Sequence, residues 1–263
     1  MEATTETGVS VRAVTPDEVH FYREHGWVFL PGLIDPDTAD QLRDGAAKLM
    51  GVRAEEEDLK GAGKLDWFTQ YFRPDREIEV FESVAHSPDL GRDAALMLGG
   101  DVAVRSMVNL TCAKPPGKGI TPFHQDHGFP IRGETLAFWI ALNDMTPEMG
   151  TMRFYDGSHK LGWLSGNPLD WPSLHEYTTL SPPLSYQRGD ATIHGSLTVH
   201  GSPENLTDTV RWAFVVNFSP ANAEYTGLPE GLETFFDADL RSRLVMGKPM
   251  DVPEFPVVYT PGR

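Results

Sequence analysis

Cysteine is almost absent from this chain of 263 residues: Cys112 is the only one, so no internal disulfide can form. It lies in a strand-like run, where a small buried apolar residue is expected. Hydrophobic runs are short as well, and none approaches the roughly 20 residues of a membrane-spanning helix. The N-terminus lacks the apolar segment of a secretory signal peptide. These absences predict a soluble cytoplasmic protein.

Positive charge is scarce too. The chain carries 22 Lys and Arg against 38 Asp and Glu, which gives a formal net charge of −16. Such an acidic surface argues against binding to nucleic acid or to an anionic membrane. It also argues, more weakly, against a polyanionic substrate such as a coenzyme A thioester. The expected partner is therefore a small molecule of another kind.

Near the middle of the chain, the segment 121–127 contains an imidazole and a carboxylate one residue apart, His124 and Asp126. In an extended strand, residues i and i+2 point to the same side, so both side chains can bind one ion. A catalytic transition metal needs a third ligand, and His200 is the best candidate. Two histidines and one carboxylate form the facial triad of non-haem Fe(II) oxygenases, which leaves coordination positions open. The spacing alone is a weak signal, because short motifs also arise by chance.

Three further residues strengthen this interpretation. Arg211 lies eleven residues after His200 and offers a planar guanidinium that matches a carboxylate. Ser202 lies two residues after His200, and its hydroxyl can donate to the same carboxylate. Trp139 begins a strand-like run shortly after Asp126. Together they indicate a pocket for a dicarboxylate whose other end chelates the metal.

From about Thr15 to Ser219, the chain resembles the phytanoyl-CoA dioxygenase family of Fe(II)/2-oxoglutarate oxygenases. The segments that carry the resemblance are Glu24-His25-Gly26-Trp27-Val28, Ala113-Lys114-Pro115-Pro116, Phe123-His124-Gln125-Asp126, Trp139-Ile140-Ala141-Leu142, Gly157-Ser158-His159-Lys160, Gly189-Asp190-Ala191, His200-Gly201-Ser202 with Asn205, and Arg211. In this order and at these spacings, they are far more specific than any one segment alone.

The resemblance implies the roles of five residues. The iron ligands would be His124, Asp126 and His200. Arg211 and Ser202 would hold the distal carboxylate of 2-oxoglutarate, the cosubstrate used together with O2. Halogenases of the family carry a small residue in place of the ligand carboxylate, so the presence of Asp126 argues against halogenation.

Further contacts with the cosubstrate are expected from four residues. The family pattern places Gln125 and Trp139 beside the metal or the cosubstrate. Asn109 and Thr111 share one parity of the strand-like run 102–113. They either face solvent or line the barrel interior and touch the cosubstrate, and the family favours the second interpretation.

The activity that the resemblance implies is a dioxygenase reaction, in which an unactivated carbon of a small molecule is hydroxylated and succinate and CO2 are released. The same chemistry can also epimerise, desaturate or close a ring. The aromatic-rich segments 64–73 and 162–177 indicate an apolar, ring-containing substrate, and tailoring of a secondary metabolite is the favoured role. Two other classes stay open: a metal-dependent hydrolase or isomerase with the same three ligands, and a non-catalytic jelly-roll binding module.

Short strands separated by Gly and Pro turns, with helices in the first hundred residues, predict a mainly β protein with helical support. The resemblance specifies a double-stranded β-helix, the jelly roll of cupins. Helices are expected over 15–26, 35–50, 87–98 and 235–241, and strands over 27–30, 102–113, 136–142, 151–155 and 212–218. The expected organisation is a loose tail over 1–14 and one domain over 15–263. That domain comprises helical support over 15–100, a jelly-roll core over about 101–220 and a C-terminal extension over 221–263.

The sequence also predicts the location of several segments and the role of three histidines outside the triad. Residues 52–78 and 162–186 read as long loops, each either packed on the core or covering the active-site mouth. Residues 250–263 are expected to lie on the surface. His159 is expected to be structural, and His194 to be structural or to support a ligand. His127 is expected to face the substrate or to be structural.

Overall fold

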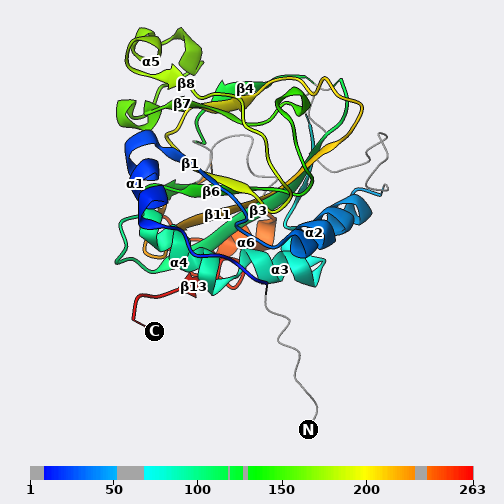
Figure 1. Cartoon of the computed structure of the whole chain (residues 1–263). Helices are drawn as coiled ribbons and strands as arrows, with labels where there is room; N and C mark the ends of the chain where they lie inside the picture. Colours follow the sequence, from blue (N-terminus) through cyan, green and yellow to red (C-terminus); the bar gives the residue numbers. More distant parts are fainter. Residues whose placement is uncertain (1–8, 52–67, 118, 127–129, 229–235, 263) are drawn as a thin grey trace.

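The computed structural model of the chain describes residues 9–51, 68–117, 119–126, 130–228 and 236–262. Two sheets face each other, and a layer of helices lies against the outer face of the larger sheet (Figure 1). Within these residue ranges, no helix has both the length and the apolar character needed to cross a membrane.

The larger sheet has seven strands, and all its neighbouring strands are antiparallel. Their order is β1 (Trp27–Leu30), β9 (Ala191–Gly195), β6 (Leu136–Ala141), β11 (Arg211–Pro220), β3 (Val104–Lys114) and β13 (Val257–Tyr259), while β2 (Thr69–Phe72) also pairs with β3. The smaller sheet has the order β4 (Thr121–His124), β10 (His200–Ser202), β7 (Arg153–Asp156) and β8 (Thr179–Leu180). Strands β5 (Ile131–Arg132) and β12 (Glu224–Tyr225) form a separate pair. The predicted fold class, a jelly roll with helical support, is confirmed.

The helices of the described residues are α1 (Pro16–His25), α2 (Pro36–Leu49), α3 (Glu79–Ala85), α4 (Pro88–Met97), α5 (Pro172–Tyr177) and α6 (Ala238–Arg243), with 3-10 turns at Pro74–Arg76, Pro147–Met149, Ser158–Leu161 and Pro168–Asp170. Three of them, α1, α2 and α4, begin at the capping residues expected from the sequence, Thr15, Asp35 and Ser87. At the start of α1, the Thr15 hydroxyl accepts from the backbone N–H of Glu18, and the Glu18 carboxylate accepts from that of Thr15. Asp35 and Ser87 cap α2 and α4 by accepting from the backbone N–H groups of Thr38 and Leu90. These side chains satisfy backbone N–H groups that have no partner within the helix.

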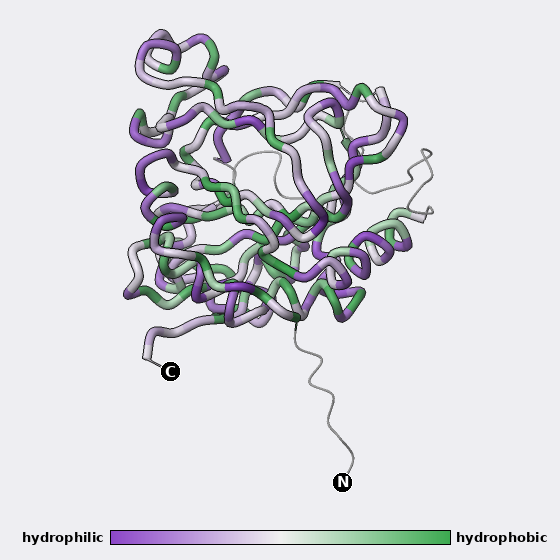
Figure 2. Tube along the Cα trace, viewed as in Figure 1, coloured by the Kyte–Doolittle hydropathy of each residue, from purple (hydrophilic) through white to green (hydrophobic). Residues whose placement is uncertain are grey.

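The larger sheet is buried on both faces. One face packs on the helices: Phe214 of β11 meets Phe81 of α3, with ring centroids 4.9 Å apart. The other face turns toward the smaller sheet and contributes Cys112, Trp139 and Val215 to the interior. Hydrophobic stretches therefore concentrate in the middle of the molecule (Figure 2). Successive residues of a strand point to opposite faces of the sheet, so alternate residues pack against the helices and the residues between them line the interior.

The N-terminal region differs from the prediction in two places. Val11 bridges to Ile34, and Val14 is buried, so residues 9–14 pack on the fold instead of forming a loose tail. Residues 1–8 lie outside the described residues. The segment expected to be irregular up to residue 78 contains β2, an added strand of the larger sheet. Of that segment, residues 52–67 are not described.

The C-terminal segment 250–263 was expected on the surface, and this prediction is wrong for three of its residues. Met250, Val252 and Phe255 are buried, and they pack with Met107 of β3. Strand β13 then pairs with the start of β3. The segment covers apolar side chains that would otherwise face water, and this burial stabilises the fold.

Candidate metal centre and cosubstrate pocket

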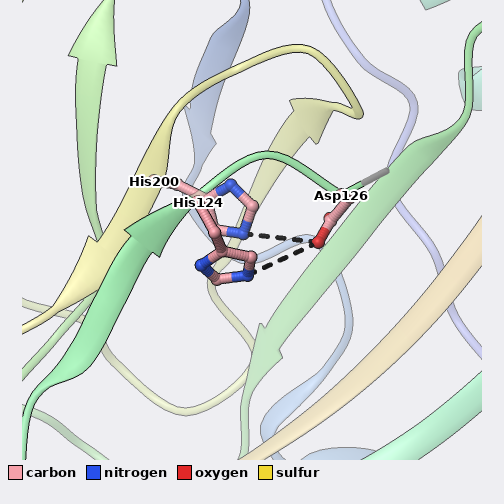
Figure 3. Close-up of side chains that lie close together, drawn as sticks. All are labelled: His124, Asp126 and His200. Atoms are coloured by element: carbon pink, nitrogen blue, oxygen red, sulfur yellow. Dashed lines mark ion pairs between the residues drawn. The ribbon is translucent and has the colours of Figure 1, made fainter. Parts of the chain in front are cut away.

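Three metal-binding side chains meet at one end of the smaller sheet. His124 ends β4, His200 begins β10, and the two residues are directly paired. Asp126 follows β4, and the ligand atoms of the three residues lie within 4.8 Å of one another. Both Nε2 atoms face the same oxygen, Asp126 Oδ1, at 3.6 Å from His124 and 3.7 Å from His200 (Figure 3). The three residues predicted from the sequence thus form one cluster.

Backbone carbonyls fix the orientation of both imidazoles. Nδ1 of His124 lies 2.8 Å from the carbonyl oxygen of Pro122, and Nδ1 of His200 lies 2.9 Å from that of Thr198. A carbonyl oxygen only accepts, so each Nδ1 carries the proton and each Nε2 keeps its lone pair. Metal-binding histidines are held in this way, through the ring nitrogen that does not touch the ion.

A fourth residue, His194 of β9, holds the other oxygen of the carboxylate. Its ring is buried, and its Nε2 lies 3.2 Å from Asp126 Oδ2. Burial would raise the pKa of Asp126, but His200, His194 and His124 outweigh it and hold this pKa well below its ordinary value. Burial, with His194 nearby, lowers the pKa of His200 well below its usual range. An ionised carboxylate and a neutral imidazole are the forms that bind a metal.

A cavity of about 470 Å³ lies between the two sheets beside this cluster. Arg211 lines it and is only 2% exposed. Its guanidinium lies over the Trp139 ring, 5.3 Å from the centroid, and donates to the Gly150 carbonyl. Among the described residues, the guanidinium has no carboxylate partner, and its Nε has no hydrogen-bond acceptor. A buried guanidinium of this kind is matched to a carboxylate that comes from a ligand.

A second buried cation, Lys114, lies next to Arg211; the sequence analysis named it within a family segment but gave it no role. The two residues are directly paired across β3 and β11. The Lys114 ammonium donates to Ser202 Oγ at 2.7 Å and to the Pro203 carbonyl at 2.8 Å. Burial, and then the nearby Arg211, lower the pKa of Lys114 to about 7. A lysine before two prolines at a strand end gives no sign of burial, and only the strand pairing reveals it.

Ser202 does not itself line the cavity. Its hydroxyl accepts from Lys114 and donates to Thr121 Oγ1 at 3.0 Å, and Thr121 faces the cavity instead. The hydroxyl expected to hold the distal carboxylate is therefore already engaged by two side chains. Its direct contact with 2-oxoglutarate stays a prediction.

Two predicted cosubstrate residues, Asn109 and Thr111, are not in the cavity. Both have the parity of β3 that faces the helices, and the cavity is lined instead by the alternate residues Val108, Leu110 and Cys112. Both faces of β3 are buried, so the hydrophobic pattern did not reveal which parity turns inward. Their assignment as cosubstrate ligands is corrected accordingly.

Gln125 also turns away from the metal side. Its Nε2 donates to the carbonyls of Gly162 at 2.8 Å and Leu197 at 2.6 Å, and its Oε1 accepts from the Leu164 N–H at 2.8 Å. The amide thus holds the loop around residue 163 to the end of β9. These bonds engage both ends of the amide, so they do not support its expected place beside the metal or the cosubstrate. Trp139 does lie in the cavity, as expected.

The remaining residues singled out from the sequence have varied outcomes. His159 is not among the three clustered metal-binding side chains, and its Nε2 donates to the Arg23 carbonyl at 3.2 Å, in agreement with a structural role. Cys112 is buried as expected, although it also lines the cavity. His127 lies outside the described residues.

Comparison with known proteins shows which family this chain belongs to. A family model described as Phytanoyl-CoA dioxygenase (PhyH) matches residues 22–213. The chain belongs to the phytanoyl-CoA dioxygenase family. Peroxisomal phytanoyl-CoA dioxygenase of Homo sapiens is 23% identical over 245 residues, which cover 81% of this chain and 70% of that protein. Phytanoyl-CoA dioxygenase domain-containing protein 1 of Rattus norvegicus is 34% identical over 273 residues, which cover 79% of this chain and 91% of that protein.

Solved structures agree with this membership. The non-heme alpha-ketoglutarate-dependent carbocyclase SnoK from nogalamycin biosynthesis has a TM-score of 0.76 at 25% identity, over 94% of this chain and 98% of SnoK. The epimerase SnoN, in complex with Fe3+, alpha-ketoglutarate and nogalamycin RO, has a TM-score of 0.78 at 23% identity, over 92% of this chain and 97% of SnoN. The second likeness shows the fold alone. Family membership confirms the predicted enzyme class, an Fe(II)/2-oxoglutarate-dependent dioxygenase.

The residues present fit the iron and the cosubstrate of this class. Two imidazole lone pairs and an ionised carboxylate form the donor set of a facial Fe(II) site. The free Nε of Arg211, in the same cavity, fits the carboxylate of 2-oxoglutarate. The predicted cofactor and cosubstrates, Fe(II), 2-oxoglutarate and O2, are confirmed for the class.

Proposed function

We propose that His124, Asp126 and His200 hold Fe(II), and that Arg211 holds the distal carboxylate of 2-oxoglutarate. One observation carries this proposal: three convergent metal ligands and a buried guanidinium without a carboxylate partner share one cavity. A buried charge is costly unless it is paired, so a buried arginine in a ligand cavity is best explained by an anionic ligand.

Each residue of the chain has a defined task in this scheme. His194 and the carbonyls of Pro122 and Thr198 fix the ligand side chains before the metal arrives. Arg211, steadied by the Trp139 ring and the Gly150 carbonyl, orients the cosubstrate. When bound, iron and 2-oxoglutarate supply an oxidant that attacks an unactivated carbon, with succinate and CO2 as by-products. The apolar walls exclude water from this chemistry.

We further propose that the substrate is a small, uncharged, largely apolar molecule that is hydroxylated. Apart from Arg211 and the residues around the metal cluster, the described lining of the cavity carries no charged side chain. Its walls are Phe68, Phe72, Val108, Leu110, Pro130, Val215 and Phe236, which suit a ring system. SnoK, 25% identical, belongs to nogalamycin biosynthesis, and this supports a role in tailoring a secondary metabolite. Since SnoK is a carbocyclase, ring closure is the second candidate outcome.

Two broader assignments accompany this proposal. Residues 15–263 act as one oxygenase domain, which is supported by the pairing of the C-terminal strand β13 with β3. The protein works in the cytoplasm, in keeping with its single cysteine.

The proposal is tested by anaerobic titration of the apo-protein with Fe(II) and then 2-oxoglutarate, while the weak visible charge-transfer band of the chelate is recorded. The band should form in the wild type and in Asp208→Ala, a control at an exposed acidic residue. It should weaken strongly in Asp126→Ala. A wild type that binds Fe(II) but gives no band would contradict the proposal and favour a metal-dependent hydrolase or isomerase.

A further inference from the structure

The cavity extends past the metal cluster along one row of the larger sheet. His194 of β9 is paired with Ala137 of β6, and Ala137 is paired with Asn217 of β11. All three line the cavity. Neighbouring strands are about 4.8 Å apart, so Asn217 lies roughly 10 Å across the sheet from the histidine that contacts Asp126. Ala137, the small residue between them, leaves the floor of the cavity open.

The side-chain amide of Asn217 is buried, and only its Nδ2 has a hydrogen-bond partner among the described residues. The residue is 4% exposed, and its Nδ2 donates to the Val108 carbonyl at 2.8 Å. That bond fixes the amide, because a carbonyl oxygen accepts only from the NH2 group. No described residue donates to Oδ1. The amide therefore presents an acceptor to the cavity.

This acceptor stands alone in an apolar part of the cavity. Around it lie Val108, Ala137 and Val215. Besides Arg211 and the residues around the metal cluster, two other described polar residues line the cavity: Thr121, whose Oγ1 accepts from Ser202, and Gln70, which is paired with Cys112, further along the strands toward Arg211. An acceptor that faces the cavity and has no described donor is free to bond a ligand, so a ligand that supplies a donor gains affinity there.

We propose that Asn217 is a specificity-determining residue that accepts a hydrogen bond from a hydroxyl or N–H group of the substrate. The inference deepens the proposed function and rests on it for the identity of the cavity as a substrate site. It narrows the substrate class to uncharged, mainly apolar molecules that carry a hydrogen-bond donor at the end that lies against Asn217. A site built to bond a donor discriminates strongly against an analogue that lacks it.

The test compares two probes of similar shape, 2-naphthol and 2-methoxynaphthalene, of which only the first has a donor. Binding to the purified protein is measured at pH 7 by ligand-observed NMR titration, without 2-oxoglutarate or oxygen. The wild type should bind 2-naphthol about three- to tenfold more tightly, which is the contribution of one neutral hydrogen bond. Asn217→Leu and Asn217→Ala should bind the two probes equally. In the alanine variant, water can reach the Val108 carbonyl, so this variant should fold even if the leucine variant does not.

Leu110→Ala provides the matched control, because Leu110 lines the same cavity without a polar group. Leu110→Ala should weaken the binding of both probes by the same factor and keep the preference for 2-naphthol. A wild type without this preference, or an alanine variant that retains it, would overturn the proposal. Because cosubstrate is absent, failure here is distinct from failure of the iron and 2-oxoglutarate titration.

Discussion

Lys114 and Arg211 lie directly opposite each other on β3 and β11, and neither forms an ion pair with a described residue. Two buried cations side by side repel each other, and burial disfavours both charges. The pair therefore costs stability in the free protein and is relieved when an anion binds. This is the pattern expected of a functional site, where stability is given up for ligand binding.

Removal of the Arg211 guanidinium should abolish discrimination between 2-oxo acids. Arg211→Met should weaken the binding of 2-oxoglutarate at least about 30-fold, because truncation of one partner of a buried charge pair costs about 2–5 kcal/mol. The affinity for 2-oxopentanoate, which has the same chain without the distal carboxylate, should hardly change. Anaerobic titration of the Fe(II) protein measures both affinities. Arg241→Met, at an exposed arginine, is the control, and an unchanged ratio of affinities in Arg211→Met would refute the role.

Lys114 should make stability depend on pH in a defined window. Its pKa is lowered from 10.5 to about 7 in the folded protein, because burial and Arg211 outweigh Cys112 and Glu204. Between these values the unfolded chain binds more protons, so the free energy of unfolding rises with pH. Lys114→Met should flatten this rise by up to about 1.4 kcal/mol per pH unit between pH 7.5 and 9.

Urea unfolding at three pH values measures the effect of Lys114. The exposed Lys48→Met is the matched control, and its curve should run parallel to that of the wild type. If the curve of Lys114→Met also runs parallel, the ammonium is not destabilised by burial, and the assignment fails.

His194 should matter for metal affinity although it is not one of the three ligands. Its Nε2 holds Asp126 Oδ2 at 3.2 Å, and loss of such a partner typically weakens metal binding 10- to 100-fold. His194→Leu should therefore lower the affinity for Fe(II) or Co(II) by about this factor, as measured by competition with a chelator. His175→Leu, on α5, should leave the affinity unchanged. Equal affinities in the two variants would show that Asp126 needs no support.

The metal cluster was accessible from the sequence for a local physical reason. His124 and Asp126 are two residues apart, and extended chain places them on one side without knowledge of the fold. His200 and Arg211 were found because the order of several motifs is specific. The burial of Lys114 beside Arg211 was not predicted, because it depends on the register between β3 and β11, which the sequence does not encode locally.

The errors share a cause in long-range packing. Asn109 and Thr111 were assigned to the interior, but β3 is buried on both faces, so its pattern left the inward parity open. Residues 250–263 were assigned to the surface because prolines suggested an irregular tail. Phe255 is nevertheless buried, and β13 extends the sheet, through contacts with residues about 150 positions earlier. Patterns within a short window do not report such pairings.

Gly150 should be needed both for stability and for the position of Arg211, because it has a left-handed backbone conformation and its carbonyl accepts from the Arg211 guanidinium. Its φ is +70°, and an added Cβ would overlap the backbone oxygens of Pro203 and Glu204. Gly166 has φ +77° with open space around it, so it is a matched control for backbone strain alone. Both alanine variants should lose about 1–2 kcal/mol of stability from the left-handed conformation.

Gly150→Ala should lose more stability than the control and should also bind 2-oxoglutarate more weakly. The overlap displaces the carbonyl that accepts from the Arg211 guanidinium, so the guanidinium loses its fixed position. Thermal unfolding and the anaerobic titration measure the two effects on the same samples. If Gly150→Ala and Gly166→Ala bind 2-oxoglutarate equally well, the Gly150 carbonyl does not position Arg211, and the Trp139 ring alone must hold the guanidinium.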